Sequence, residues 1–364
     1  MKTVFLVCTG LGRINRGYET FTQECFDALK NESVFDMYLF KGAGKESDKE
    51  KVISNVHRHH FLAKFFAKLI RKDAYFIEQF TFFVSFIWSL LKYKPSVVFY
   101  SDFILGTFLW NFRRLTDLKY HLLFSNGAPN GPPFSRCDMV QQLLPFYYDI
   151  AIEAGEPVSQ QFLLPYGFAM PTPQTKSMTE LRASLGIPQH SFVILSVGAI
   201  NASHKRMNYL IDEIASLDRG NVFLLLLGQN TSETESIEKL AIDKLGTSFV
   251  IKNVTYENIG QYYRLSDLFV LCSLSEGFGR VYIEALSYGL PVIAHDYKVA
   301  REVMSDCATY VDMKKIGVLR NELVNAVLAG RNEDTKQHNI AYVKQNYAWE
   351  KLKDRYIEMI NKLI

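Results

Sequence analysis

The stretch SLSEGFGRVYIEALSYGLPVIAHD, from Ser273 to Asp296, combines the features that decide the fold. It follows the apolar run DLFVLC, which is typical of a buried strand. Within it come a loop with two glycines, an amphipathic segment that ends at Gly289, and a second apolar run. Strand, loop, helix and strand in this order predict a βαβ unit of a parallel sheet. Two carboxylates, Glu276 and Glu284, stand eight positions apart around the loop, where a core strand and a core helix need no acid.

The same alternation of apolar runs and amphipathic segments continues through all 364 residues. It predicts an α/β protein of two domains, each with a parallel sheet covered by helices on both faces. Residues 163–180 contain three prolines and show no periodicity, so we place the domain junction there. We expect one domain over residues 1–165 and a second over residues 166–346, followed by an amphipathic helix over residues 347–364.

The apolar runs predict the individual strands. Those of the first half are Thr3–Cys8, Phe35–Phe40, Val97–Tyr100, His121–Phe124 and Ile150–Glu153. Those of the second half are Phe192–Val197, Phe223–Leu227, Phe249–Lys252, Leu268–Cys272, Pro291–Ala294 and Thr309–Val311. Between them lie helical patterns, including Tyr18–Leu29 and Phe61–Lys92.

Composition excludes several classes of protein. A net charge of +3 and a pI near 8.4 are far from the strongly basic footprint of a nucleic-acid-binding protein. The five cysteines are scattered without a C-x-x-C pair, which argues against disulfides or a zinc site and favours a reducing compartment. The first apolar run is too short for a signal peptide, and FTFFVSFIWSLL (residues 80–91) is too short to span a bilayer. We therefore expect a cytoplasmic protein.

The loop of the opening stretch predicts an anion site. A loop that feeds a helix N-terminus directs unpaired backbone N–H groups outward, and Gly277 and Gly279 allow a phosphate to approach closely. Glu284 could accept hydrogen bonds from the vicinal hydroxyls of a ribose, and Glu276 from those of a sugar ring. The alternative is that Glu276 caps the helix and that Glu284 is a solvated helical residue. The joint occurrence on one strand–loop–helix unit favours the functional interpretation.

EGFGRVYIEAL followed by GLPVIA resembles the E-x7-E signature of retaining glycosyltransferases of the GT-B fold, family 4. LRASLGIPQHSFVILSVGAINASHKRMNYLI is similar to the segment that opens the nucleotide-binding domain of that family, and YAWEKLKDRYIEMI to its closing helix. The resemblance covers residues 163–364. In the N-terminal half it rests on RINRGYETFTQECFDAL alone.

The resemblance implies two Rossmann-like, doubly wound domains that face each other across a cleft, with helix 347–364 crossing back onto the first. The N-terminal domain would bind the acceptor and the C-terminal domain a UDP- or GDP-linked sugar. The implied reaction is retaining transfer of that sugar to a hydroxyl of a glycan, a lipid-linked molecule or another acceptor, in cell-surface glycan or glycoconjugate synthesis. No cofactor and no metal are implied, and the sequence contains no D-x-D pair.

The same resemblance implies roles for individual residues. Glu276 would contact the donor sugar, Glu284 the ribose, and Lys205 would neutralise the departing diphosphate. Further donor contacts would come from Gly17, Gly198, Val254, Gly277, Phe278 and Gly279.

Two positions depart from the family pattern. Ala199 stands where the family usually has an arginine, so we expect the second cation at Arg206; the alternative is a solvated residue at a helix start. Ser125 or Asn126 stands where many members have a histidine directed at the sugar. We expect Asn126, and the Gly/Pro/Asn-rich loop over residues 125–136, to line the acceptor side of the cleft.

Three other functions were weighed. GLGRINRG misses the G-x-G-x-x-G spacing and no acid closes the second strand, so a dinucleotide-binding dehydrogenase is rejected. A sugar-nucleotide epimerase or hydrolase on the same scaffold remains an alternative, as does a non-catalytic sugar-nucleotide-binding partner of another transferase. Ala199 and the missing histidine favour the non-catalytic alternative, whereas Glu276, Glu284 and Lys205 argue against it.

One helix of the first half is basic and amphipathic. Within residues 61–72, Lys64, Lys68 and Arg71 share one face, while leucine and phenylalanine side chains share another. Such a helix could make a peripheral contact with the inner face of the membrane. We favour the alternative that its apolar side packs on the sheet, because any α/β domain contains such helices.

Overall fold

The computed structural model describes residues 2–14, 16–172, 177–217 and 220–364. The chain forms two compact units. The N-terminal unit comprises residues 1–169 together with 349–364, and the C-terminal unit comprises residues 170–348. The chain therefore leaves the first unit after Ala169, where the sequence predicted a boundary after residue 165, and its last helix belongs to the first unit.

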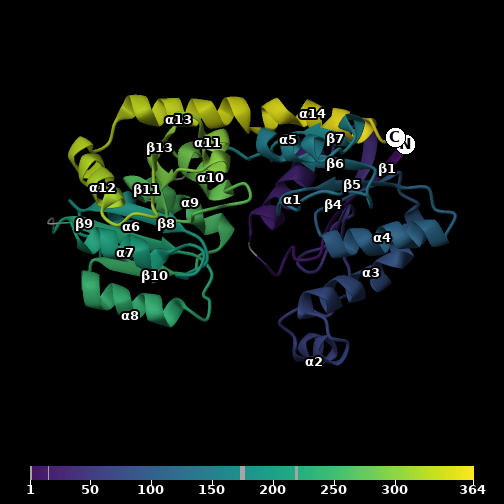
Figure 1. The fold of residues 1–364 in the computed structure, drawn as a ribbon, viewed down its shortest axis with the longest axis horizontal. Coiled ribbons are helices and arrows are strands. Elements are labelled where there is room, and N and C mark those ends of the chain that lie inside the picture. Colours follow the sequence, from purple (N-terminus) through teal and green to yellow (C-terminus); the bar gives the residue numbers. More distant parts are fainter. Residues whose placement is uncertain (1, 15, 173–176, 218–219) are drawn as a thin grey trace. The chain divides into compact units, whose positions relative to one another are not determined.

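The N-terminal unit is built on a parallel seven-stranded sheet with the order β3-β2-β1-β4-β5-β6-β7 (Figure 1). Its strands are β1 (Lys2–Cys8), β2 (Phe35–Lys41), β3 (Glu50–Val52), β4 (Val97–Tyr100), β5 (His121–Ser125), β6 (Met139–Gln142) and β7 (Gln161–Leu163). Its helices are α1 (Gly17–Leu29), α2 (Phe61–Leu69), α3 (Ala74–Tyr93), α4 (Phe103–Leu115), α5 (Pro145–Glu153) and α14 (Trp349–Asn361), with a short 3-10 turn η1 (Val158–Gln160).

The C-terminal unit is built on a parallel six-stranded sheet with the order β10-β9-β8-β11-β12-β13. Its strands are β8 (Phe192–Val197), β9 (Val222–Leu227), β10 (Phe249–Lys252), β11 (Leu268–Leu271), β12 (Val292–His295) and β13 (Ala308–Val311). Its helices are α6 (Met178–Ser184), α7 (Met207–Ala215), α8 (Thr234–Leu245), α9 (Tyr256–Leu265), α10 (Arg280–Ser287), α11 (Lys298–Met304), α12 (Val318–Ala329) and α13 (Glu333–Asn346).

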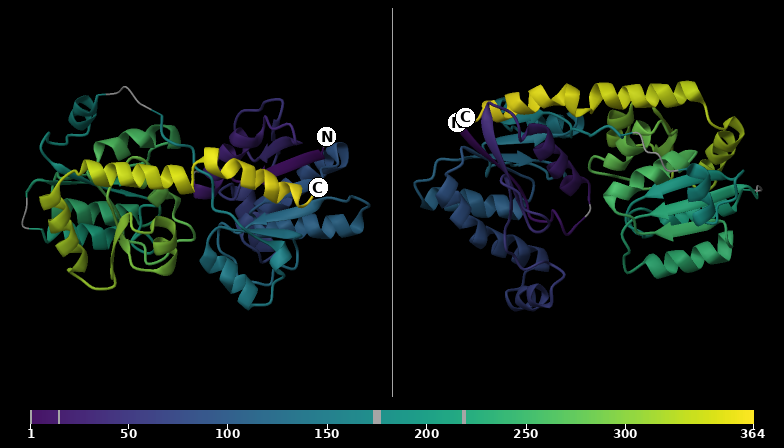
Figure 2. Two further views of the ribbon diagram at one scale, coloured as in Figure 1. Left: turned by 90° about the horizontal axis from the view of Figure 1, so that it is seen from above. Right: turned by 180° about the vertical axis from the view of Figure 1, so that it is seen from behind.

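In both units helices cover the two faces of the sheet (Figures 1 and 2). The central strands are therefore apolar along their whole length, as all four residues of β4 and all six of β9 are buried. The predicted fold class, α/β with two Rossmann-like parallel-sheet domains, is confirmed.

One predicted strand is wrong. Ile150–Glu153 is the second half of helix α5, and the strand at this point of the chain is β6, residues 139–142. The pattern misled because β6 carries two buried glutamines, Gln141 and Gln142, which read as polar. Their amide N–H groups have partners inside the unit: Gln141 Nε2 donates to Leu164 O at 2.9 Å, and Gln142 Nε2 donates to a neighbouring glutamine side chain at 2.8 Å.

The helical pattern over Phe61–Lys92 divides into α2 and α3. The break follows Arg71, whose φ of 55° is left-handed, and Asp73 then caps α3 by accepting from Phe76 N at 2.7 Å. The apolar run at residues 80–91 was expected to be too short to span a bilayer, but it belongs to the 20-residue helix α3. Within the described chain α3 is the helix whose length and composition would allow a membrane crossing. One of its sides, with Phe82, Phe86 and Leu90, belongs to the core of the N-terminal unit.

Helix α2 packs on α3 in a manner that differs from the prediction (Figures 1 and 2). The residues it buries are Ala63 and Ala67, which form a small cluster with Ile77 of α3. Its large apolar side chains are exposed, with Phe65 63% and Leu69 69% accessible. The favoured interpretation, a helix that packs these side chains on the sheet, is therefore wrong.

Candidate functional site

The site lies in the C-terminal unit at the point where the strand order reverses. β8 is followed along the sheet by β9 on one side and by β11 on the other, so the loops that leave β8 and β11 diverge. In doubly wound sheets ligands bind at such a switch point, outside the carboxyl ends of the strands. The two loops contain most of the predicted donor-binding residues.

A close ion pair joins the two loops. Lys205 follows β8 and Glu276 follows β11; Nζ of the lysine lies 2.5 Å from Oε1 of the glutamate. Their side chains are only 13% and 11% exposed. His204 adds a second nitrogen 3.9 Å from the same oxygen. Glu276 therefore faces the lysine, whereas the residue at the N-cap of α10 is Gly279, without a side-chain cap.

The loop after β8 is organised so that Lys205 reaches across. Asn201 Oδ1 accepts hydrogen bonds from the backbone N–H groups of His204 at 3.1 Å and Lys205 at 2.7 Å. The aliphatic stem of Lys205 runs over Gly198: a Cβ at this glycine would lie 2.8 Å from Cε and 3.0 Å from Cδ of the lysine. A side chain at position 198 would therefore displace the stem of Lys205 from this path.

The loop after β11 enters α10 through a glycine in the left-handed region. Gly279 has a φ of 73°, and a Cβ there would lie 2.5 Å from the ring of Tyr282, so a side chain is excluded twice over. Phe278 is 4% exposed and packs edge-on to Tyr347. The first N–H groups of α10 have no acceptors within their own helix and carry partial positive charge. The geometry therefore suits an anion, as the sequence predicted.

Glu284 is buried rather than solvated. It is 8% exposed, and its Oε2 accepts a hydrogen bond of 2.8 Å from the hydroxyl of Tyr263 on α9. Its Oε1 lies 3.7 Å from Nε of Arg280, one helical turn away. Burial and the neighbouring Glu284 carboxylate raise the pKa of Tyr263 well above its usual value, so the phenol remains a donor. The interpretation of Glu284 as a solvated residue is thereby excluded, and Tyr263 and Arg280 join the site.

Arg206 lies beside Lys205 in sequence, but their side chains diverge. Arg206 has a left-handed backbone (φ 52°) at the start of α7. Its Nη1 donates to Met313 O at 2.8 Å, and its guanidinium lies over the ring of Tyr209 at 4.5 Å. Arg206, predicted as the second cation for the diphosphate, thus contacts Met313 and Tyr209. Unlike Lys205, it does not pair with Glu276.

Two predicted donor contacts lie outside these two loops. Val254 is half-buried in the loop between β10 and α9, at the carboxyl end of the same sheet. Gly17 is the first residue of α1 in the N-terminal unit, directly after Arg16, whose Nη2 pairs with Glu19 at 2.6 Å. The resemblance implies a backbone contact with the donor at both positions, and these contacts stay predictions.

Asn126 differs from its predicted role as a substrate-facing residue. It is 1% exposed, and its amide is used within the N-terminal unit. Nδ2 donates to Gln142 Oε1 at 3.0 Å, and Oδ1 accepts from Asn130 N at 2.8 Å. An amide is well suited to hold a loop that contains glycine and proline, because it can donate and accept at once. In this structure Asn126 shapes the loop from inside.

The sequence analysis missed a polar cluster at the switch point of the N-terminal sheet, between β1 and β4. Asp102 follows β4, and its carboxylate accepts from Thr9 at 3.0 Å and from the hydroxyl of Tyr75 at 2.5 Å. Gln79 donates to Thr9 at 2.5 Å, and Asp102 is 9% exposed. An acid two residues after an apolar strand was the available signal.

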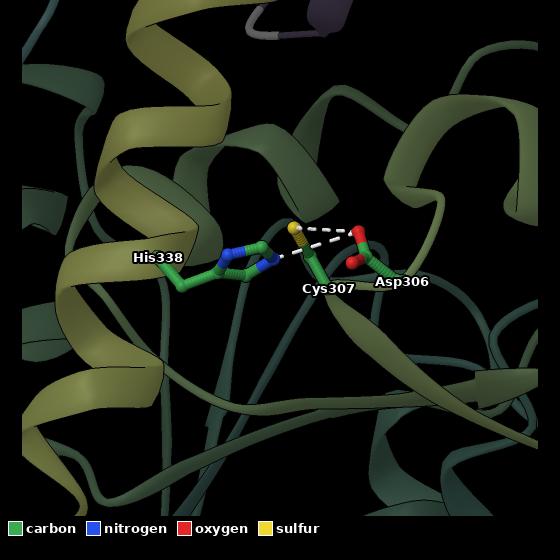
Figure 3. Close-up of side chains that lie close together, drawn as sticks. All are labelled: Asp306, Cys307 and His338. Atoms are coloured by element: carbon green, nitrogen blue, oxygen red, sulfur yellow. Dashed lines mark hydrogen bonds and ion pairs between the residues drawn. The ribbon is translucent and has the colours of Figure 1, made fainter.

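Among the residues that the structure describes, one group of side chains could hold a metal ion. Asp306, Cys307 and His338 offer ligand atoms within 4.8 Å of one another (Figure 3). His338 Nε2 lies 3.5 Å from Asp306 Oδ1, which a surface ion pair explains, and burial raises the pKa of Cys307 to about 12. Asp306 and Cys307 come just before β13, at the amino end of that strand, and His338 comes from α13, so the group is separate from the Lys205–Glu276 pair.

Comparisons with known proteins agree with this geometry. Residues 177–341 match the family Glycosyl transferases group 1. The chain is 29% identical to the amylovoran biosynthesis glycosyltransferase AmsD of Erwinia amylovora over 46% of each chain. It is 25% identical to the alpha-monoglucosyldiacylglycerol synthase of Streptococcus pneumoniae over 48% of this chain and 40% of that protein. The chain thus spans less than half the length of these relatives.

Solved structures resemble the whole chain. Sucrose-phosphate synthase from Thermosynechococcus elongatus superposes with a TM-score of 0.79 at 17% identity, over 100% of this chain and 99% of that one. Anabaena HepE in complex with UDP-glucose gives 0.75 at 15% identity, over 99% and 100%. At this identity the likeness shows the fold, which is GT-B. Together the comparisons support a glycosyltransferase.

Replacing Gly198 by alanine is expected to separate the ion pair. The new Cβ would occupy the path of the Lys205 stem, so the ammonium has to leave Glu276 Oε1. A crystal structure of Gly198→Ala should show the distance between Lys205 Nζ and Glu276 Oε1 lengthened beyond about 4 Å, the usual limit of an ion pair. Gly220→Ala is the matched control, since a Cβ there meets open space. An unchanged pair in Gly198→Ala would contradict the steric argument.

Proposed function

We propose that this chain is a retaining glycosyltransferase that moves a sugar from a UDP- or GDP-linked donor to an acceptor hydroxyl. The C-terminal unit binds the donor and the N-terminal unit binds the acceptor. The observation that carries the proposal is the nearly buried pair of Lys205 and Glu276 at the switch point of the C-terminal sheet. A family match over residues 177–341, which include both residues, supports it.

A fold alone does not require this pair. Taking two charges out of water costs several kcal/mol per ion, roughly, and their attraction offsets this cost only with excellent geometry. The nearly buried pair lies in loops that follow two apolar strands. It therefore contributes little to the stability of the fold. A ligand that needs both a cation and an acceptor accounts for it: a diphosphate for Lys205 and sugar hydroxyls for Glu276.

In the proposed reaction the departing nucleoside diphosphate gathers negative charge. Lys205, the amides around Gly277–Gly279 and the start of α10 stabilise that charge, because preorganised donors act most strongly where charge develops. Lys205 exchanges its bond with Glu276 for one with a phosphate oxygen. Glu276 is then released to accept from the sugar.

Glu284 holds the ribose in this proposal. Its Oε2 is oriented by Tyr263, and a carboxylate has roughly four lone-pair positions, so it can accept from a vicinal diol as well. The nucleobase lies near Val254, in the next loop of the same sheet edge.

We propose retention because the chain resembles retaining glycosyltransferases, and the carboxylates are not placed as in a retaining glycosidase. Retaining glycosidases place two carboxyl groups about 5–5.5 Å apart on opposite sides of the scissile bond. Here Glu276 and Glu284 belong to one strand–loop–helix unit and serve the donor. The proposed base is the leaving phosphate itself, which takes the acceptor proton on the face it departs from.

The donor and acceptor classes follow from the relatives. HepE was solved with UDP-glucose, and AmsD and the glucosyldiacylglycerol synthase bear the names of polysaccharide and glycolipid enzymes. We propose a glycan or lipid-linked acceptor, a reaction without a metal cofactor, and a cytoplasmic site of action.

A transfer assay tests the function directly. The full chain is incubated with UDP- and GDP-sugars, and release of nucleoside diphosphate is measured with and without glycan and glycolipid acceptors, in parallel with excess EDTA. We expect release that depends on an acceptor and survives EDTA. Release without an acceptor would indicate a hydrolase, binding without turnover a non-catalytic protein, and loss of activity on chelation with recovery in magnesium a metal-dependent enzyme.

Glu284→Gln should weaken binding of the bare nucleoside diphosphate. The ribose loses a charged acceptor worth about 1.5–3 kcal/mol, which is roughly a 10- to 150-fold rise in Kd. Calorimetry with UDP and GDP measures it. Tyr263→Phe is the comparison variant, because it retains the charge of Glu284 and removes only one donor to it. Equal affinity in wild type and folded Glu284→Gln would rule out the ribose assignment.

Two alanine variants should show that Lys205 acts in turnover and that Arg206 stabilises the fold. We expect Lys205→Ala to lower turnover by about 10²–10³-fold, as for loss of a preorganised donor to developing charge. Arg206→Ala removes a hydrogen bond to Met313 and a ring contact, so its main effect should be a lower Tm. If Arg206→Ala loses as much turnover as Lys205→Ala while keeping its Tm, Arg206 is the second phosphate cation after all.

A further inference from the structure

Helix α2 is inverted relative to an ordinary surface helix. Its small residues Ala63 and Ala67 face the protein at 0% and 5% exposure, whereas its largest apolar side chains face outward. Ten of the nineteen exposed large hydrophobic side chains in the described chain lie within residues 61–91. Those of α2 and its end are Phe61, Leu62, Phe65, Phe66, Leu69 and Ile70. A contiguous patch of this kind marks an interaction surface.

Helix α3, on which α2 packs, adds a second apolar strip. Phe80, Val84, Trp88 and Leu91 recur at intervals of four, four and three residues, so they share one side of the helix. They are 44%, 51%, 74% and 44% exposed. The opposite side of α3 is in the core. Helix α3 thus carries large apolar side chains both on its core side and on this accessible strip, which is unusual outside contact with an apolar medium.

The charge of this region is of one sign. Residues 57–94 contain seven lysines or arginines and two acids, a net +5, whereas the whole chain carries +3, so the remainder carries −2. Of the two acids, Glu78 is fully buried and pairs with Arg58. Lys64 and Lys68 stand exposed between the outward phenylalanines of α2. A second copy of this chain would bring two positive faces together, which like-charge repulsion disfavours.

We propose that α2 and the outer strip of α3 dock the protein on the surface of an anionic lipid bilayer. Exposed phenylalanine and leucine enter the boundary between headgroups and acyl chains, while lysines between them reach the phosphates. Trp88 fits the same interface, where its ring finds both apolar and polar surroundings. The cytoplasmic leaflet is the anionic one. This inference is independent of the proposed transferase activity.

A cavity on the same helices fits a lipid as well. It has a volume of about 300 Å³ and lies where α3 meets α4, lined by Phe76, Phe103, Ile104 and Phe108 together with Lys72, Asp73 and Thr107. Its aromatic and aliphatic walls match the acyl chain of a lipid. The cavity extends the docking surface from α2 to the start of α4.

Flotation of the full chain with vesicles tests the proposal. Vesicles of phosphatidylcholine with phosphatidylglycerol should carry the protein upward at low salt, vesicles of phosphatidylcholine alone should carry much less, and high salt should release it. Phe65→Ser with Leu69→Ser should weaken binding by about tenfold or more, since two buried apolar side chains are lost. Lys64→Glu with Lys68→Glu should weaken it by at least about 25-fold.

Matched variants control for general effects of exposed residues. Ile316→Ser with Leu328→Ser removes two exposed apolar side chains of the C-terminal unit, and Lys239→Glu with Lys244→Glu reverses two exposed lysines of α8. Both should bind vesicles as wild type. The changed side chains of α2 are all exposed, so every variant should retain its Tm and its affinity for nucleoside diphosphate.

Three outcomes would overturn the docking proposal. Wild type that stays in solution with anionic vesicles at low salt is the first. Binding that the α2 variants leave unchanged is the second. The third is a dimer in solution that Phe65→Ser with Leu69→Ser converts to a monomer without any vesicle binding, which would assign the surface to a second copy.

Discussion

Parallel strands leave their loops on one edge of the sheet, and that constraint governs the candidate site. Because β8 and β11 are neighbours whose connections run in opposite directions, residues more than seventy positions apart meet at their carboxyl ends. Lys205 and Glu276 approach to 2.5 Å for this reason. Gly198 supplies the space for the lysine stem, and Gly279 the turn into α10. If β8 and β11 were antiparallel, the loops that follow them would lie at opposite edges of the sheet, and Lys205 and Glu276 would not meet.

The C-terminal unit places charge where an apolar fold would not need it. Glu284 is 8% exposed and depends on Tyr263 and Arg280 for partners, while Lys205 and Glu276 depend on each other. Breaking such a pair is costly because the remaining charge is buried without compensation. Each of these residues can therefore either keep its partner in the protein or bind a ligand group. The proposed donor offers a diphosphate for Lys205, a sugar for Glu276 and a ribose for Glu284.

The N-terminal unit departs from ordinary folding rules in the other direction, by leaving apolar side chains in contact with solvent. Burying Phe65 or Leu69 would stabilise the fold by about 1.5–3 kcal/mol each, yet α2 turns alanines inward instead. Small residues allow α2 to lie close against α3, and the large ones remain available outside. The proposed donor site accounts for the charge in the C-terminal unit, and the proposed lipid contact accounts for the apolar surface of the N-terminal unit.

By itself the sequence determined the two α/β units, ten of the thirteen strands in the described chain, and the glycine loop with its two acids, because these depend on local periodicity and on turn chemistry. It missed the short strands β3, β6 and β7. Only the tertiary structure decided that Ile150–Glu153 is helical, since a strand with two buried glutamines reads as polar until its partners are known. The same holds for Asn126, whose amide is used internally, for Arg206, which turns to Met313, and for the outward face of α2. Burial and pairing are relations between distant segments, and the spacing of residues along the chain does not contain them.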